Sequence, residues 1–500
     1  MRRTLHVVIP PVVATLIGAA LSVLAFPPFG PGVLIVPGIA FFLFGLRSVD
    51  SRSHGFWLGL LYGFAFFGGL MWWLGLLDPL ALMLVPVQAV FPAIYGWGLA
   101  GSRRAGAVRW FSYAVGGWAL MEMIRYRFPV GGQEWGAAGY ALSDNLYLRL
   151  PAEAAGTSGL TVVIVVFAAL ITLAMDRSWD RRLLWALLLP VAAVVASIPS
   201  IITVHDTGSY PVAIVQGSTP CPFEHCPPDE RLRTFEQHLT LTGTIEPGSV
   251  ELVVWPESST GSSNADPLAN DEIRQAIADQ ARRIGSWILV GGDRLVADQE
   301  FINSNVMFDP TGEIVGEYRK QHGVPFGEYV PARPLFEWIP ALDQVPRDMV
   351  AGDGPVVFDI GIVDLGSVIS WEGGFSRYAL EHRREGANAL AVTTNKASYG
   401  RDAPTSDQFI GMTRMRAVEL GIPVVHAAVT GKSTVIDYQG EFDATTQTGE
   451  TIVYYGDIGT STSTLYSTIG DLVIYLCALV FVALWVRNRR LLPLHRRTNQ

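Results

Sequence analysis

The sequence predicts an α/β domain carried on a bundle of eight transmembrane helices. Half of the 500 residues are hydrophobic and only 16% are charged, and the mean hydropathy of +0.31 is too apolar for an ordinary soluble protein. Apolar segments crowd roughly the first 200 residues, whereas short β-branched runs alternate with charged, helix-periodic ones after them. We therefore expect a membrane protein with one large water-exposed domain.

Eight segments are apolar and long enough to cross the roughly 30 Å of bilayer hydrocarbon. They are residues 8–26, 32–46, 56–77, 80–100, 110–121 with its flanks, 160–175 with its flanks, 183–202 and 472–486. One of the shorter segments alone could be a buried core helix, but seven in succession leave no soluble core to bury them. We predict seven helices within residues 1–205, and an eighth with a basic tail within residues 466–500.

Arginine residues mark one side of the predicted membrane. They lie at both ends of the chain and in every second loop: Arg2, Arg3, Arg47, Arg52, Arg103, Arg104, Arg109, Arg177, Arg181, Arg182, Arg487, Arg489, Arg490, Arg496 and Arg497. Arg125 and Arg127 are exceptions. The positive-inside rule then places both termini in the cytoplasm and residues 206–465 outside it. The first span is expected to be retained, because another span follows it without a small-residue cleavage site.

The cysteines agree with an oxidising exterior. Cys221 and Cys226 lie five residues apart in a proline-rich loop, which favours a disulfide. A metal clip with His225 is the alternative, although zinc usually takes four ligands. Cys477 falls within the last span, where inert packing is expected. We expect no cofactor and no nucleic-acid partner, because neither a metal, nucleotide or redox motif nor a basic patch is visible.

The outer segment has the alternating pattern of an α/β domain. Strands are predicted at residues 212–216, 252–255, 287–290, 305–308, 356–360, 366–369, 389–393, 424–428 and 433–437, and helices at residues 229–242, 271–283, 375–384 and 406–420. Glu257 follows one predicted strand and Ser370 follows another. Sites of α/β folds gather beyond the carboxyl ends of strands, so these two residues are candidates for a common site.

Three short motifs carry a resemblance to a known family. They are Trp255-Pro256-Glu257-Ser258, then Lys320 with the later Pro325-Phe326-Gly327-Glu328, then Ser370-Trp371-Glu372. Other matching stretches are residues 215–217, 318–320, 326–331, 395–400 and 414–419, and two pairs in an outer membrane loop, Phe128-Pro129 and Gly139-Tyr140. Over nearly its whole length the chain resembles the apolipoprotein N-acyltransferase family, which is the membrane-bound branch of the nitrilase superfamily.

The resemblance implies a fold, a reaction and a place in the cell. It implies an αββα nitrilase-like sandwich outside a bacterial cytoplasmic membrane, with phospholipid as acyl donor and a diacylglyceryl lipoprotein as acceptor. Glu257 would be the base, Lys320 would stabilise the oxyanion, and Ser370 would be the nucleophile. Glu328, Trp371 and Glu372 would support them.

The apolar cleft that lipid substrates need is expected between the domain and the helices. Trp135, Phe128 and Phe326 are candidates to line it. Interfacial or core packing explains these three aromatic residues equally well.

The chain departs from the family pattern near the expected site. Ser370 stands where a cysteine is expected, and a serine alkoxide is far harder to form than a thiolate. Trp371 replaces a tyrosine, and a tryptophan expected soon after residues 216–217 is missing. Lys396 and Ser398 replace an aspartate and a tryptophan of the 395–400 loop.

Three hypotheses remain open. The first is an acyltransferase of lipoprotein biosynthesis that forms a serine ester. The second is a catalytically impaired homologue that binds lipid or lipoprotein as a partner of another protein. The third is an acyltransferase with a different acceptor, including an amidase that passes the acyl group to water. Glu257 and Lys320 favour an enzyme, since binding alone requires neither.

Overall fold

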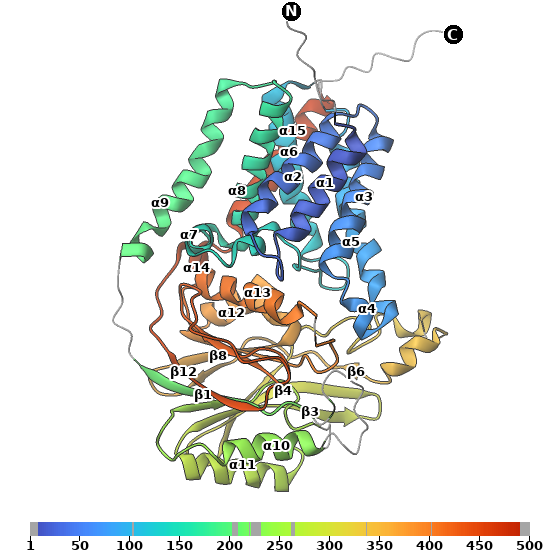
Figure 1. Cartoon of the computed structure of the whole chain (residues 1–500). Coiled ribbons are helices and arrows are strands. Elements are labelled where there is room, and N and C mark those ends of the chain that lie inside the picture. The colour runs from blue at the N-terminus through green and yellow to red at the C-terminus, as the bar shows by residue number, and fades with distance from the viewer. Residues whose placement is uncertain are drawn as a thin grey trace, which may run out of the picture.

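The helices of the N-terminal part and the last helix stand side by side, and the strands lie beyond one end of them (Figure 1). The computed structural model describes residues 9–102, 105–202, 209–219, 221, 232–261, 266–336, 338–401 and 403–490. The helices at the predicted spans are α1 (Pro11–Leu24), α2 (Ile35–Arg47), α3 (Arg52–Leu70), α5 (Leu84–Leu99), α6 (Ala107–Arg125), α8 (Ala152–Met175), α9 (Leu188–Ile202) and α15 (Leu472–Arg490). Short helices α4 (Leu74–Leu77), α7 (Leu146–Arg149) and α14 (Leu465–Ile469) lie towards the strands.

Membrane attachment through apolar helices is supported by length and hydropathy. Three described helical segments are long and apolar enough to cross a bilayer: Pro79–Leu99, Ala152–Met175 and Arg181–Ile198. Three shorter apolar ones are Pro11–Leu24, Gly32–Arg47 and Leu472–Arg487. Helices α3 and α6 occupy the two remaining predicted spans and pack against α5 and α15. The full count of eight crossings stays a prediction.

Small residues let α3 and α5 pack closely. A Cβ atom added at Gly59 would lie 2.0 Å from the carbonyl oxygen of Pro92, and one at Gly55 would lie 2.4 Å from that of Gly96. Glycines spaced by four residues form one stripe of a helix, and membrane helices use such stripes because lipid offers no hydrophobic drive for their association. The sequence of α3 therefore specifies its neighbour.

Two contacts bring arginine-bearing loops together at the end of the bundle away from the strands. The Arg47 Nε atom lies 2.7 Å from the Asp176 Oδ2 atom, and the Arg52 guanidinium lies 4.9 Å from the ring centroid of Trp97. Helix α1 begins and α15 ends at this same end (Figure 1). The grouping agrees with a single arginine-rich side of the membrane.

The strands form two sheets. The first has the order β12-β1-β2-β3-β4-β5, with β6 paired to β4, and the second has the order β11-β10-β9-β8-β7. Their bounds are β1 (Tyr210–Gln216), β2 (Leu252–Val254), β3 (Trp287–Ala297), β4 (Glu300–Phe308), β5 (Ile314–Arg319), β6 (Asp348–Met349), β7 (Val357–Asp359), β8 (Asp364–Ile369), β9 (Ala389–Thr394), β10 (Val424–Ala428), β11 (Thr434–Ile436) and β12 (Ile452–Ile458).

The two sheets pack face to face between two pairs of helices, as an αββα sandwich requires (Figure 1). The outer pairs are α10 (Leu232–Thr242) with α11 (Asp271–Ile284), and α12 (Ser376–Arg384) with α13 (Thr405–Leu420). In β1, Val212 and Ile214 point between the sheets, whereas Ala213 and Val215 pack towards α10 and α11. This alternation follows from the two-residue period of a strand.

Helices α12 and α13 belong to the sandwich and also face the bundle. One continuous hydrophobic cluster joins Phe409 and Met412 of α13, strand residues such as Val392, and bundle residues such as Phe67. The bundle therefore packs as a fifth layer against the four layers of the sandwich, on the side of the second sheet. The domain is attached to the bundle by this packing as well as by the connecting segments.

All nine predicted strands and four predicted helices are present, with shifted ends. The prediction missed β5, β6 and β12. Strand β5 lies at the end of the first sheet, and polar residues interrupt its apolar ones. Strand β6 has only two residues, so neither strand carries a strong apolar signal. The start predicted for α10, residues 229–231, lies outside the described residues, as does Cys226 of the predicted disulfide.

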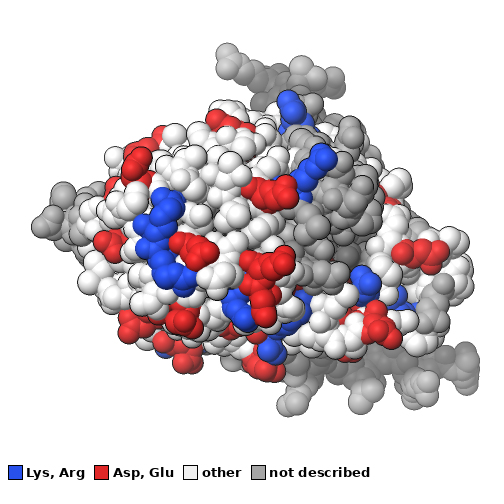
Figure 2. Space-filling view, turned by 90° about the horizontal axis from the view of Figure 1, so that it is seen from below, with Lys and Arg blue, Asp and Glu red and all other residues white. Residues whose placement is uncertain are grey.

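The face of the sandwich away from the bundle carries interspersed charges of both signs (Figure 2). On α11, Arg274 lies 2.5 Å from Asp271 and Arg282 lies 2.5 Å from Asp279. Such exposed pairs three residues apart contribute little to stability but are typical of a water-facing helix. The water-facing side of the domain is thus opposite the bundle.

Gln408 on α13 ties the domain to the bundle through four hydrogen bonds. Its Oε1 atom accepts from the indole nitrogens of Trp73 and Trp135 at 3.3 and 2.9 Å. Its Nε2 atom donates to the carbonyl oxygens of Pro27 and Leu70 at 3.1 and 3.2 Å. One buried amide thereby joins three separate bundle segments to α13.

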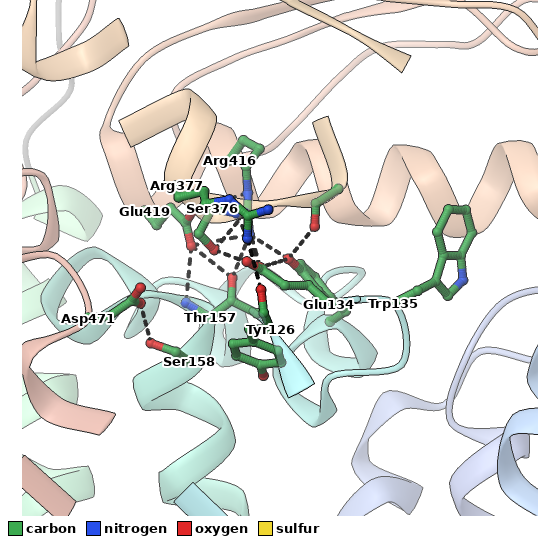
Figure 3. A network of polar contacts seen from close by, with 12 residues as sticks. Tyr126, Glu134, Trp135, Thr157, Ser158, Ser376, Arg377, Arg416, Glu419 and Asp471 are labelled. Atoms are coloured by element: carbon green, nitrogen blue, oxygen red, sulfur yellow. Dashed lines mark hydrogen bonds and ion pairs between the residues drawn. The ribbon is translucent and has the colours of Figure 1, made fainter. Parts of the chain in front are cut away.

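Arg416 and Glu419 on α13 form a second tie (Figure 3). The Arg416 Nε atom lies 3.1 Å from the Glu419 Oε1 atom. Glu419 Oε2 accepts from the Thr157 hydroxyl at 2.8 Å and from its backbone nitrogen at 3.1 Å. That nitrogen is available because α8 is kinked at Gly156, where φ is 69°. The ion pair is buried, and the hydrogen bonds from Thr157 to Glu419 connect α13 to α8.

We expect Gln408→Leu to destabilise the protein. The change leaves two indole donors and two carbonyl acceptors without their partner, and each unsatisfied buried group costs about 1–3 kcal/mol. The apparent melting temperature in detergent should fall by several degrees, whereas Gln275→Leu, at an exposed position on α11, should leave it unchanged. Equal melting temperatures for the two variants would contradict the proposed tie.

Candidate active site

Charged residues from the first two motifs meet in one buried cluster. The Lys320 Nζ atom lies 3.0 Å from Glu257 Oε1 and 2.6 Å from Glu328 Oε1. Lys320 is 1% and Glu257 5% exposed. Glu257 follows β2 and Lys320 follows β5, so the ends of two strands of the first sheet deliver the pair.

Further hydrogen bonds fix both carboxylates. The Asn303 Nδ2 atom donates to Glu257 Oε1 at 2.9 Å, and the Asn395 backbone nitrogen donates to Glu257 Oε2 at 2.8 Å. The Val324 backbone nitrogen donates to Glu328 Oε2 at 2.7 Å, which closes the turn between Lys320 and Glu328. Because Asn395 follows β9, Glu257 reaches across to the second sheet.

The Lys320 ammonium is held in its charged form. Burial alone would lower its pKa, but the carboxylates of Glu257 and Glu328 outweigh burial and raise the pKa well above its usual value. A cation fixed in a poorly solvated place exerts a strong field on a nearby developing negative charge. Lys320 therefore has the properties expected of an oxyanion-stabilising group.

Glu372 ties the turn of Ser370 to the turn of Lys320. Its Oε2 atom accepts from the Ile369 backbone nitrogen at 2.8 Å and from the Tyr318 hydroxyl at 2.9 Å. Its Oε1 atom accepts from the backbone nitrogens of Gln321 and His322 at 2.5 and 2.9 Å. The Glu372 carboxylate thus joins the loop after β5 to the loop after β8. Ser370 lies in the second of these loops.

Strained backbone marks all three motifs. Ser258, Phe326 and Ser370 have φ values of 52°, 60° and 50°. This left-handed region is uncommon for residues other than glycine, and each such residue costs about 1–3 kcal/mol unless its surroundings impose it. Strain of this kind clusters at functional sites, so its presence in each motif supports the assignment of the site.

Aromatic rings connect the site to the bundle. The Trp135 ring stacks on Trp371 at a centroid distance of 5.8 Å and on Phe409 at 6.0 Å. Trp135 is only 3% exposed, whereas Phe128 and Phe326 are 65% and 44% exposed. Of the three aromatic residues expected to line a cleft, Trp135 alone is packed in this stack.

The structure therefore holds five of the six predicted residues in two neighbouring sets of contacts and leaves one less constrained. Glu257, Lys320 and Glu328 share an ion cluster, while Glu372 and Trp371 hold the adjoining turn. The Ser370 hydroxyl makes no hydrogen bond within the described part of the chain. The catalytic roles of these residues remain predictions.

Two polar residues near Glu257, the buried Asn303 and the partly buried Asp293, escaped the sequence analysis. Asn303 lies within β4, and Asp293 lies within β3 and accepts a hydrogen bond from the Ser258 hydroxyl at 2.8 Å. Burial, together with the negative charges of Glu257 and Glu328, raises the pKa of Asp293 to about 7. The strands themselves gave no clear signal, because Asp293 adjoins Arg294 in β3, and β4 contains Ser304 and Asn305 besides Asn303.

Comparison with known proteins now identifies the family. Residues 18–170 match the apolipoprotein N-acyltransferase N-terminal domain, and residues 211–466 match the carbon-nitrogen hydrolase family. An apolipoprotein N-acyltransferase of Rhizobium meliloti is 30% identical over 464 residues, which is 84% of each chain. The chain belongs to the apolipoprotein N-acyltransferase family.

Other apolipoprotein N-acyltransferases match over similar lengths. That of Geobacter metallireducens is 27% identical over 95% of each chain, and that of Mycolicibacterium smegmatis is 28% identical over 85% of this chain and 76% of its own. Among solved structures, an amidase from Nesterenkonia sp. is 17% identical, with a TM-score of 0.41 over 55% of this chain and 98% of its own.

We expect Asp293→Asn to stabilise the protein increasingly as the pH rises. The folded-state pKa of about 7 lies above the usual value for aspartate, so the folded state holds the proton more tightly and loses stability as the pH rises from about 4 to 7. Asparagine cannot ionise. The difference in apparent melting temperature between variant and parent should grow across this window and level off above it, and a constant difference would contradict the assignment.

Proposed function

We propose that the protein is an apolipoprotein N-acyltransferase that moves an acyl chain from a phospholipid to the α-amino group of an S-diacylglyceryl cysteine. The observation that carries the proposal is the buried cluster of Lys320, Glu257 and Glu328 beside the turn of Ser370. A binding protein has no use for a desolvated cation held by two carboxylates, since burial of these charges is costly.

In the first half-reaction Ser370 attacks the ester carbonyl of the phospholipid. The Oγ–C bond forms while the hydroxyl proton leaves to a base, and Lys320 stabilises the negative charge on the carbonyl oxygen. The bond to the glycerol oxygen then breaks, that oxygen takes up the proton, and a lysophospholipid departs. The acyl chain stays on Ser370 as an ester.

In the second half-reaction the acceptor amine attacks this ester. Glu257 takes the proton of the amine, Lys320 again stabilises the oxyanion, and the Ser370 oxygen leaves with a proton as the amide forms. Family chemistry assigns Glu257 the proton transfers of both halves. The hydrogen bonds from Asn303 and Asn395 hold the carboxylate in place for this role.

The arrangement of the domain suits two lipid substrates. We propose that the helices cross the bacterial cytoplasmic membrane eight times, with both termini in the cytoplasm and the sandwich outside. The Trp135 ring of the bundle stacks on both Trp371 and Phe409 of the domain, so the candidate site adjoins the apolar interface between the domain and the helices. The charged face of the sandwich points to water (Figure 2).

One observation favours the alternative of an impaired homologue that binds lipid or lipoprotein. No base donates to or accepts from the Ser370 hydroxyl within the described residues, and a carboxylate is a weak base for a serine. Acylation of the Ser370 hydroxyl distinguishes the enzyme from the impaired homologue, so the first experiment addresses this residue.

We expect purified protein in detergent to produce N-acyl lipopeptide from phospholipid and a diacylglyceryl lipopeptide. Ser370→Ala should abolish the product, because no nucleophile remains, and Ser370→Cys should retain it. Ser249→Ala, at an exposed position, is the matched control. Intact mass of enzyme and lipopeptide provides the measurement. Activity in the Ser370→Cys protein alone would favour the impaired homologue.

We expect Lys320→Met and Glu257→Gln to lose transfer activity by roughly 100-fold or more, as removal of an oxyanion-stabilising or acid–base group does. Steady-state rates at saturating phospholipid provide the test. Met and Gln preserve size, and retention of the parent's gel-filtration profile would show that folding is intact. Activity within about fivefold of the parent would contradict the assigned roles.

A further inference from the structure

Lys396 is a second buried lysine at the edge of the candidate site. It lies two residues beyond β9 and is 5% exposed. Its Nζ atom lies 4.5 Å from the ring centroid of Phe409, 4.9 Å from that of Tyr399 and 6.0 Å from that of Trp135. No carboxylate forms an ion pair with it in the described part of the chain, so aromatic faces hold this amine.

The use of lysine in this chain is selective. The sequence has three lysines against 33 arginines, and two of the three, Lys320 and Lys396, lie at this site. Arginine supplies a permanent charge and stacks well on aromatic rings, whereas lysine can give up its proton when it is buried. A lysine at position 396 therefore indicates a need for an amine that titrates.

Sheet geometry places Lys396 beside Ser370. Strands β8 and β9 are parallel neighbours, with Ile369 paired to Thr393, so both chains leave the same edge of the sheet about 4.8 Å apart. Trp371 and the Lys396 amine both lie against Trp135. The lysine stem is flexible, and a role for the amine at Ser370 requires it to turn from the rings towards the neighbouring turn.

The two candidate bases differ in hydrogen bonding and in charge. Glu257 already accepts three hydrogen bonds, from Lys320, Asn303 and Asn395. Burial lowers the pKa of Lys396 to about 8, with Glu257 opposing the shift and Lys320 adding to it. A substantial neutral fraction is thus present near pH 8, and its basicity lies well above that of an ordinary carboxylate.

We propose that Lys396 is the general base that activates Ser370. The neutral amine takes the Ser370 hydroxyl proton as the Oγ–C bond forms, and returns that proton to the leaving glycerol oxygen as the ester bond breaks. Lysine serves serine nucleophiles in this way on unrelated folds. The inference rests on the proposed function and changes one step of it. Lys396 takes the proton of Ser370 in place of Glu257, and Glu257 still takes the proton of the acceptor amine.

The proposal accounts for two departures from the family motifs with one cause. Ser370 replaces a cysteine, and Lys396 replaces an aspartate of the 395–400 loop. A thiol needs no base stronger than a carboxylate, whereas a hydroxyl does. The two substitutions are then one coupled change.

The test uses a p-nitrophenyl acyl ester, which reports acylation of Ser370 without the natural lipids. Four proteins are compared: the parent, Lys396→Met, Ser370→Cys, and the double variant. Met keeps the stem volume and packs well against aromatic rings. Lys432→Met is the control, since Lys432 pairs with Asp407 and carries no role in the site. The p-nitrophenolate burst and the mass of the peptide that carries the acyl group are recorded.

We expect Lys396→Met to slow acylation at least 100-fold in the serine background and less than fivefold in the Ser370→Cys background. An equal loss in both backgrounds, no loss in the serine background, or a parent in which Ser370 is never acylated would overturn the proposal. Acylation by the ester without transfer between phospholipid and lipopeptide would instead contradict the proposed function alone.

The pH profile is an independent readout. The acylation rate of the parent should rise with pH with an apparent pKa near 8, and this rising limb of the pH profile should be absent in Lys396→Met. The other groups facing the amine are Glu257, Lys320, Tyr399 and His426. Burial raises the pKa of Tyr399 to about 12 and lowers that of His426 to about 3, and the pKa of Lys320 is raised, so these three do not produce that limb. Persistence of the limb in Lys396→Met would overturn the proposal.

Discussion

The Lys320 ammonium lies between two carboxylates in a place that water scarcely reaches, and the arrangement of the site follows from that interaction. A buried charge is tolerated only where partners and hydrogen bonds satisfy it. Glu257 and Glu328 provide the partners, and backbone or side-chain donors in turn hold both of them. The turns of the first two motifs must therefore meet, and Glu372 joins the turn of Ser370 to that of Lys320, even though each motif contains a residue in a strained conformation.

The bundle provides one wall of the site as well as an anchor. Trp135 belongs to a loop between α6 and α8, yet its ring stacks on Trp371 beside Ser370. The Arg125 guanidinium and Gln408 hold Trp135 through its carbonyl oxygen and its indole nitrogen. The position of Trp135 beside Trp371 thus depends on how α13 packs against the helices, to which the contacts of Arg416 and Glu419 also contribute (Figure 3).

Sequence reasoning was strongest where one pattern repeats or one motif is local. The β-branched runs located nine strands, and the first two motifs located the ion cluster, because short strings determine both. It failed for β5, whose apolar pattern is weak although it pairs with the preceding β4, and for β6 and β12, which pair with strands distant in the chain. It also missed Asn303 and Asp293, whose importance arises only once β3 and β4 bring them beside Glu257. Of the three aromatic residues expected to line a cleft, Trp135 is buried whereas Phe128 and Phe326 are exposed, and this difference depends on the folded surface and not on any local pattern.

The most direct test of the account is the location of the acyl group after incubation with phospholipid alone. Without an acceptor, the account predicts one acyl chain per protein, carried by the peptide that contains Ser370 and bound as an oxygen ester that resists neutral hydroxylamine. Peptide mapping by mass spectrometry distinguishes this from other adducts. An unmodified Ser370 peptide, or an acyl chain found only on another residue such as Cys477, would contradict the central claim.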